Sequence, residues 1–112
     1  MSQAAFYARV STRRQEQEAT IESQVEQLLT YAQQNGLEVP VAHRYIDQAI
    51  SGQRLARPAL DRLRDEALAR AFTVVLCLSP DRLARNLGAQ QVILDEMKRA
   101  GVQVIFISQP NL

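Results

Sequence analysis

The run FTVVLCL, residues 72–78, is almost continuously apolar and has the length of a β-strand. Such a strand is usually central and covered on both faces, because a strand with one wet face alternates apolar and polar residues. A helical pattern that begins at Pro58 precedes it, and a second one follows the break at Ser79-Pro80 and ends at Gly101. The segment therefore predicts a buried strand between two helices.

The same alternation continues toward both ends of the chain. Residues 3–10, 37–46 and 102–108 are further predicted strands, the second of them entered through Pro40. A helical period begins at residue 19 and lies between the first two of these strands. Strands that alternate with helices predict one α/β domain, with a mainly parallel sheet of four or five strands and helices on both faces.

Apolar residues at helical spacing indicate which helix faces pack on the sheet. Residues 48–57 show Ser-Gly and no clear period, which predicts a mobile loop before the second helix. The only histidine, His43, falls within the second predicted strand. The predicted apolar positions of the later helices are Leu60, Leu63, Ala67, Leu68, Val92, Ile93 and Met97.

Composition limits the class of protein. The chain has 112 residues, of which 46% are apolar and 22% charged, as expected for one globular domain. There is no secretory signal and no run of transmembrane length, and the single cysteine, Cys77, cannot form an internal disulfide, so we expect a reducing, cytoplasmic setting. The net charge of +1 argues against a basic field over the whole domain. Twelve of the thirteen basic residues are arginines, which suits phosphate binding, although genomic base composition would give the same bias.

Polar residues follow the predicted strands where each strand ends. The first strand leads into Arg9 and Ser11, the second ends at Asp47, and the third is followed by Asp81 and Arg82. Functional sites of open parallel sheets lie outside the carboxyl ends of the strands. We therefore expect these residues to meet at one edge of the sheet.

Ser11 has neighbours that suit phosphoryl transfer better than acyl transfer. Taken alone, a serine after a strand is commonly a turn residue, but Arg9 lies two positions back and so faces the same side of an extended chain. Acyl transfer pairs a serine with a base such as histidine, and His43 is placed in a strand instead. Fixed cations stabilise the negative oxygens of a phosphoryl-transfer transition state, so Ser11 among arginines fits that chemistry.

The segment SPDRLARN, residues 79–86, adds further cations. If Asp81 lies near a helix start it can cap free N–H groups, and Arg82 and Arg85 then share one helical face at i and i+3. The alternative is an ordinary solvated face. No glycine-rich phosphate loop and no metal-ligand spacing are present, so nucleotide hydrolysis and a metal site are not predicted.

Three motifs occur in order along the chain: YARVST at residues 7–12, DQAISG at 47–52 and DRLARN at 81–86. Together they resemble the catalytic domain of serine recombinases, the resolvase/invertase family that includes the large serine integrases. The resemblance covers residues 4 to 108, and the TIESQ segment favours a large recombinase or integrase. It implies a resolvase-like three-layer sandwich and a site-specific DNA recombinase activity.

The resemblance also implies roles for individual residues. Ser11 is the nucleophile that attacks a DNA phosphodiester and forms a covalent 5′-phosphoserine link, and Arg9 contacts the scissile phosphate. Two roles remain open for Asp81, namely moving a proton to the leaving 3′ oxygen and orienting arginines. The segment after the serine, with Arg13 and Arg14, receives no catalytic role. The remaining implied catalytic arginines are Arg57, Arg82 and Arg85, and the implied supporting residues are Tyr7, Gln24 and Asp47.

Family membership further implies partners. In this family a tetramer breaks the DNA, exchanges the strand partners by rotation of its subunits and rejoins the strands without a metal or nucleotide cofactor. A dimerisation helix and a DNA-binding domain follow the catalytic domain. We therefore expect residues 1–112 to be a catalytic fragment of a bacterial or phage-encoded recombinase, with weak DNA affinity of its own. The competing hypotheses are a recombinase-like module without catalysis, and a flavodoxin-like or receiver-like domain that binds a small anion.

Overall fold

The computed structural model describes residues 2–10, 20–48 and 57–108, which form a five-stranded parallel sheet between helices. The strands follow the order β2-β1-β4-β5, and β3 pairs with β1 as well. Every pairing is parallel, as predicted. The strands are β1 Ser2–Val10, β2 Leu37–Glu38, β3 Arg44–Gln48, β4 Val74–Cys77 and β5 Gln103–Phe106.

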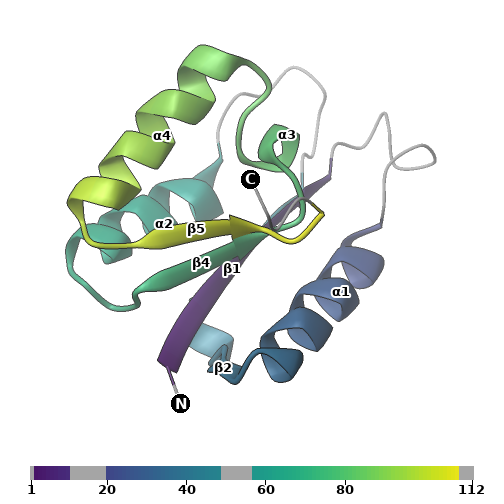
Figure 1. The fold of residues 1–112 in the computed structure, drawn as a ribbon. Coiled ribbons are helices and arrows are strands. Elements are labelled where there is room, and N and C mark those ends of the chain that lie inside the picture. Colours follow the sequence, from purple (N-terminus) through teal and green to yellow (C-terminus); the bar gives the residue numbers. More distant parts are fainter. Residues whose placement is uncertain (1, 11–19, 49–56, 109–112) are drawn as a thin grey trace.

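The helices make a layer on each face of the sheet. Figure 1 shows α1 on one face and both α2 and α4 on the other. The short helix α3 lies near the end of β1, and both a contact with β1 and its place in Figure 1 put it at the carboxyl edge of the sheet. The helices are α1 Ile21–Gln34, α2 Pro58–Leu68, α3 Pro80–Leu83 and α4 Leu87–Arg99.

Alternate residues of β1 enter the two halves of the core. Ala5 and Tyr7 pack with the buried residues of α2 and α4, whereas Phe6 and Ala8 pack with those of α1. All four side chains are fully buried. Strand β4, which pairs with β1 and β5, is buried on both faces in the same way. The central position predicted from residues 72–78 is confirmed.

The second predicted strand is wrong as a single element. It divides into β2 and β3, with a 3₁₀ turn, η2 Val41–His43, between them. Pro40 lies at the break with φ −60°, and its ring nitrogen has no hydrogen to donate to a sheet ladder. His43 is therefore a turn residue, not a strand residue, and its ring packs edge-on against Phe72 with centroids 5.3 Å apart.

Two predicted core positions are also wrong. Leu68 is 63% exposed and Val92 is 56% exposed, whereas their neighbours Ala67 and Ile93 are buried. Each step along a helix turns the side chain by about 100°, so a residue next to the centre of the buried face can point to its solvent side, as Leu68 and Val92 do. Leu68 is also the last residue of α2, where the helix leaves the core.

Candidate active site

Arg9 lies at the carboxyl end of β1, where its backbone and its side chain are both fixed. The buried Gln24 side chain of α1 donates from Nε2 to the Arg9 carbonyl (3.0 Å) and accepts from the Arg9 N–H (3.4 Å). The guanidinium donates from Nε to the carbonyl oxygen of Arg82 (3.3 Å) and from Nη2 to that of Asp81 (3.1 Å). The end of β1 is thus joined to α1 on one side and to α3 on the other.

The Asp47 carboxylate organises the next part of the site. It pairs in register with Arg9 across β1 and β3 and is 8% exposed. One oxygen accepts from the Ala59 N–H (2.9 Å), and the other accepts from the Leu60 N–H (3.1 Å) and from the Tyr7 hydroxyl (2.8 Å). These N–H groups are orphan donors of the first turn of α2, so Asp47 caps that helix from a neighbouring strand.

Arg57 occupies the N-cap position of α2 without a capping bond of its own. Its guanidinium donates from Nε and Nη2 to the Tyr7 hydroxyl oxygen (3.2 and 3.0 Å) and from Nη2 to the Arg82 carbonyl (2.8 Å). Tyr7 therefore donates to Asp47 and accepts from Arg57. Burial, with a further contribution from Asp47, raises the pKa of Tyr7 well above its ordinary value, so the phenol stays protonated.

The guanidiniums of Arg9 and Arg57 both bind backbone carbonyls of the short helix α3. The Arg82 carbonyl oxygen accepts hydrogen bonds from both Arg9 and Arg57, and the Arg82 side chain is itself 8% exposed. The last carbonyls of a helix have no partner within it, so they are natural acceptors for cationic side chains. The Ser79 hydroxyl donates to the Asp81 carboxylate, which lies at the exposed side of the turn.

Arg82 and Arg85 do not share a helical face, and that prediction is wrong. The chain leaves α3 at Ala84, which is extended at φ −160° and ψ 155°, and α4 begins only after Asn86. Asn86 caps α4, because its Oδ1 accepts from the Ala89 N–H (2.7 Å). Arg85 lies in the connector of residues 84–86 between α3 and α4 and is exposed, whereas Arg82 is buried. Asp81 does not make the predicted cap either, since the bond to its carboxylate comes from Ser79.

Most of the site residues predicted from the sequence lie close together at the carboxyl end of β1. A continuous set of hydrogen bonds joins Tyr7, Arg9, Gln24, Asp47, Arg57 and the α3 turn with Asp81 and Arg82. Arg85 makes no hydrogen bond or ion pair to another described residue. Ser11 lies outside the described residues, as do Arg13, Arg14 and most of the predicted loop at 48–57.

Sequence reasoning missed two residues that shape the connector. Asn86 has a recognisable signal, since asparagine directly before a helical period is a common N-cap. Gln90 has none: its Nε2 donates to the Ala84 carbonyl (2.8 Å), and nothing in the sequence distinguishes it from the neighbouring Gln91.

Among the described residues, Cys77 and the acidic side chains were the other candidates for a nucleophile or for metal ligands. Burial raises the pKa of the Cys77 thiol to about 12, so it stays protonated at neutral pH. Within the described parts of the chain, no three His, Cys, Asp or Glu side chains gather as metal ligands. None of the helices in those parts combines the length and apolarity needed to cross a membrane.

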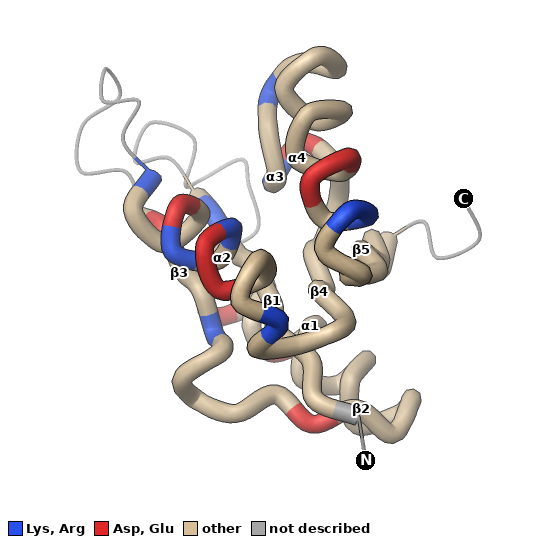
Figure 2. Tube along the Cα trace, turned by 90° about the vertical axis from the view of Figure 1, so that its left-hand side faces the viewer, with Lys and Arg blue, Asp and Glu red and all other residues tan. Residues whose placement is uncertain are grey.

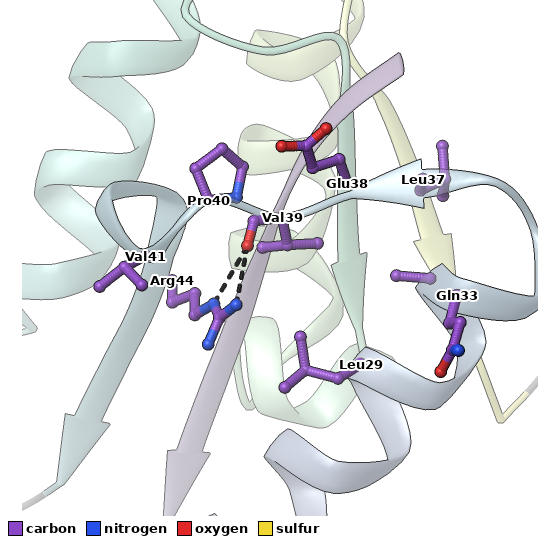
Figure 3. Close-up of a pocket in the computed structure, with 9 residues that line it drawn as sticks. Leu29, Gln33, Leu37, Glu38, Val39, Pro40, Val41 and Arg44 are labelled. Atoms are coloured by element: carbon purple, nitrogen blue, oxygen red, sulfur yellow. Dashed lines mark hydrogen bonds between the residues drawn. The ribbon is translucent and has the colours of Figure 1, made fainter. Parts of the chain in front are cut away.

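A separate hollow of about 500 Å³ lies at the other end of the sheet (Figure 3). Its wall includes Arg44, whose Nε and Nη2 donate to the Val39 carbonyl (3.1 and 3.0 Å). The hollow lies beside β2, which pairs with the first residues of β1, whereas Arg9 lies at the opposite end of that strand. It includes no predicted site residue; its lining is Leu29, Ala32, Gln33, Leu37, Glu38, Val39, Pro40, Val41 and Arg44.

Comparison with known proteins identifies the family. Residues 4–112 match the family described as Resolvase, N terminal domain. The chain therefore belongs to the resolvase N-terminal domain family. It is a catalytic domain of the serine recombinase type, and the fold and family expected from its three motifs are confirmed.

Individual relatives agree with this resolvase assignment. A Bacillus subtilis (strain 168) protein named "Putative DNA recombinase" is 37% identical over 105 residues, which make up 93% of this chain and 20% of that protein. The chain thus spans about a fifth of the length of this curated relative. The N-terminal catalytic domain of TP901-1 integrase superposes with a TM-score of 0.81 at 30% identity, covering 96% of this chain and 78% of that one. A resolvase family site-specific recombinase from Streptococcus pneumoniae superposes with a TM-score of 0.85 at 25% identity, covering 98% of this chain and 74% of that one.

Proposed function

We propose that this resolvase-type domain cleaves and rejoins DNA strands through a covalent 5′-phosphoserine intermediate on Ser11. In the cleavage step the Ser11 oxygen bonds to phosphorus and the bond from phosphorus to the 3′ oxygen breaks. The serine loses its proton, and the departing 3′ oxygen gains one and becomes a hydroxyl. The phosphoserine is itself a phosphodiester, so attack by a 3′ hydroxyl reverses the step and restores DNA.

The observation that carries this proposal is the convergence of Arg9, Arg57 and Arg82 at the carboxyl end of β1. Ser11 follows Val10, the last residue of that strand, directly in the sequence. The guanidiniums of Arg9 and Arg57 bind the same carbonyl oxygen, at 3.3 and 2.8 Å. Two cations within reach of one oxygen atom can also contact two oxygens of one phosphate, as stabilisation of a phosphoryl-transfer transition state requires.

The remaining residues have supporting roles in this proposal. Gln24 fixes the backbone of Arg9, while Tyr7 and Asp47 fix Arg57 and the start of α2. Asp81 is exposed and hydrogen-bonded to Ser79, an arrangement that leaves a carboxyl group at the surface for proton transfer to the 3′ oxygen. We assign the exposed Arg85 to the phosphate as well, approaching it from the connector.

The wider setting follows from the family. We propose that the substrate is DNA, that no metal or nucleotide is needed, and that dimers and tetramers of the complete recombinase perform strand exchange in the cytoplasm of a bacterial host. Basic and acidic residues are interspersed along α2 (Figure 2), so that helix has no extended basic surface for DNA. Specific DNA recognition is therefore proposed to need protein segments beyond this domain.

The proposal is tested by trapping cleavage with the complete polypeptide and a supercoiled plasmid that carries two recombination sites. Quenching with denaturant is expected to leave protein joined to 5′ ends and free 3′ hydroxyls that a polymerase can extend. Ser11→Ala removes the nucleophile, so the adduct should disappear. Ser23→Ala is the matched control, because the Ser23 hydroxyl lies on α1 and accepts one exposed hydrogen bond, from Gln27 Nε2 (3.2 Å), while its backbone N–H, which donates to the Thr20 hydroxyl, stays in place.

The outcome distinguishes the competing hypotheses. Wild type forms an adduct only if the domain is catalytic, because neither a module without catalysis nor a domain that binds only small anions forms one with either protein. An adduct that persists in Ser11→Ala would show that another residue is the nucleophile.

A further inference from the structure

We infer that Gln90 is a positioning residue that holds Arg85 in place for the DNA phosphate. This inference rests on the proposed function, because it gives Arg85 a phosphate to bind. It concerns the connector of residues 84–86, which joins α3 to α4 and presents Arg85.

The connector is anchored on both sides of Arg85. Before it, the Ala84 N–H donates to the Pro80 carbonyl (3.1 Å), and the Ala84 carbonyl accepts from Gln90 Nε2 (2.8 Å). After it, the Asn86 side chain caps α4 through the Ala89 N–H (2.7 Å). Residues on both sides of Arg85 are thus fixed, and the Gln90 bond ties the buried Ala84 to the body of α4.

Arg85 depends on this backbone more than the other site arginines do. Arg9 and Arg57 are oriented through their guanidiniums, which bind the Arg82 carbonyl. Arg85 is exposed, and its side chain makes no hydrogen bond or ion pair to another described residue. Within the described chain, the position of the Arg85 guanidinium is therefore set by the backbone of the connector alone.

The Gln90 contact differs from the usual behaviour of a glutamine on a helix surface. The next residue, Gln91, is exposed and bonds within the helix, from Nε2 to the Asp95 carboxylate (3.0 Å). Gln90 is half-buried and instead reaches back, past the start of α4, to residue 84. These two adjacent side chains give a matched pair of variants: Gln90→Met removes the bond to the connector, and Gln91→Met removes one that lies within α4.

The test combines both variants with Arg85→Ala in the complete polypeptide. With saturating two-site DNA, Gln90→Met is expected to slow covalent adduct formation about tenfold, the effect of one lost hydrogen bond on a transition-state contact. Gln91→Met is expected to leave the rate within twofold of wild type. DNA affinity and the urea unfolding midpoint should be alike in the two variants.

A double-mutant cycle separates positioning from a general structural effect. If Gln90 acts through Arg85, Gln90→Met causes no further loss once Arg85 is alanine. An equal tenfold loss in both backgrounds overturns the inference, as does a wild-type rate in Gln90→Met.

Amide hydrogen exchange gives a readout that does not depend on catalysis. Exchange of the Ala84 N–H, which donates to the Pro80 carbonyl, should rise in Gln90→Met and stay unchanged in Gln91→Met. If wild type forms no Ser11-dependent adduct, the proposed function has failed, and equal exchange in the two variants then overturns the anchoring role of Gln90 separately.

Discussion

Replacing Asp47 by alanine should destabilise the domain substantially, because Asp47 is a buried carboxylate with three hydrogen-bond donors. Its side chain is 8% exposed and accepts three hydrogen bonds, from Tyr7, Ala59 and Leu60. Two of these come from the first turn of α2, where Arg57 provides no side-chain cap. Asp47→Ala therefore leaves a buried phenol and two helix N–H groups without their acceptor.

The magnitude follows from these three donors. Loss of a helix cap costs about 1–2 kcal/mol, and a buried hydroxyl left without its charged partner costs about 1–3 kcal/mol. The sum is about 3 kcal/mol, a large fraction of the roughly 5–15 kcal/mol that stabilises an ordinary domain. Asp47→Asn keeps one acceptor oxygen but loses the charge at the helix N-terminus, so an intermediate loss of about 1–2 kcal/mol is expected.

Urea unfolding followed by circular dichroism measures this difference. Asp61→Ala is the control, since Asp61 also lies in the first turn of α2 but is exposed, so its loss should cost about 0.5 kcal/mol through the helix dipole and its attraction to Arg64. An Asp47→Ala protein as stable as the Asp61→Ala protein would refute the capping role. Equal losses in Asp47→Ala and Asp47→Asn would instead assign the whole effect to charge.

Three further predictions concern single side chains. Tyr7→Phe removes one of the two acceptors of the Arg57 guanidinium, so stability should fall by about 1–2 kcal/mol and adduct formation should slow. An unchanged rate would mean that the phenol does not orient the arginine. The hydrogen bond from Arg64 lowers the pKa of the Glu96 carboxyl below its ordinary value of 4.5, so their stabilisation is present above that pH and is lost as acid titrates the folded carboxyl. Glu96→Gln should therefore flatten the acid limb of the stability profile below about pH 4.5, and parallel profiles would contradict the ion pair. Cys77, whose pKa burial raises to about 12, should react with a thiol reagent only after unfolding, and rapid labelling in buffer would contradict its burial.

The order of elements was predictable because each depends on a local pattern. Alternation of apolar runs with helical periods gives the parallel sheet, and the sheet alone brings Arg9, Asp47 and Asp81 to one edge. The errors lie where two local rules compete. Pro40 divides a run that otherwise reads as one strand, and Ala84 is extended although alanine strongly favours a helix.

The contacts inside the site were not predictable, because most of the acceptors that the arginine side chains use belong to the backbone. Sequence patterns suggest that Arg9 and Arg57 face a phosphate, but not that both bind the carbonyl oxygen of Arg82. Backbone carbonyls are common to all residues, so no residue type at position 82 signals this role. The same is true of Ala84, whose carbonyl is the acceptor for Gln90.

This choice of acceptors affects the charge of the site. Arg64 of α2 forms an ion pair with the carboxylate of Glu96 of α4, so the positive charge of Arg64 is cancelled locally. Arg57 binds a phenol oxygen and a carbonyl oxygen, both neutral, so it is oriented and keeps its full positive charge. Carboxylate partners would have to be displaced before a phosphate could bind, at the cost of a charge-assisted bond. Neutral acceptors hold the arginine in place without competing for its charge, which is what a preorganised phosphate site needs.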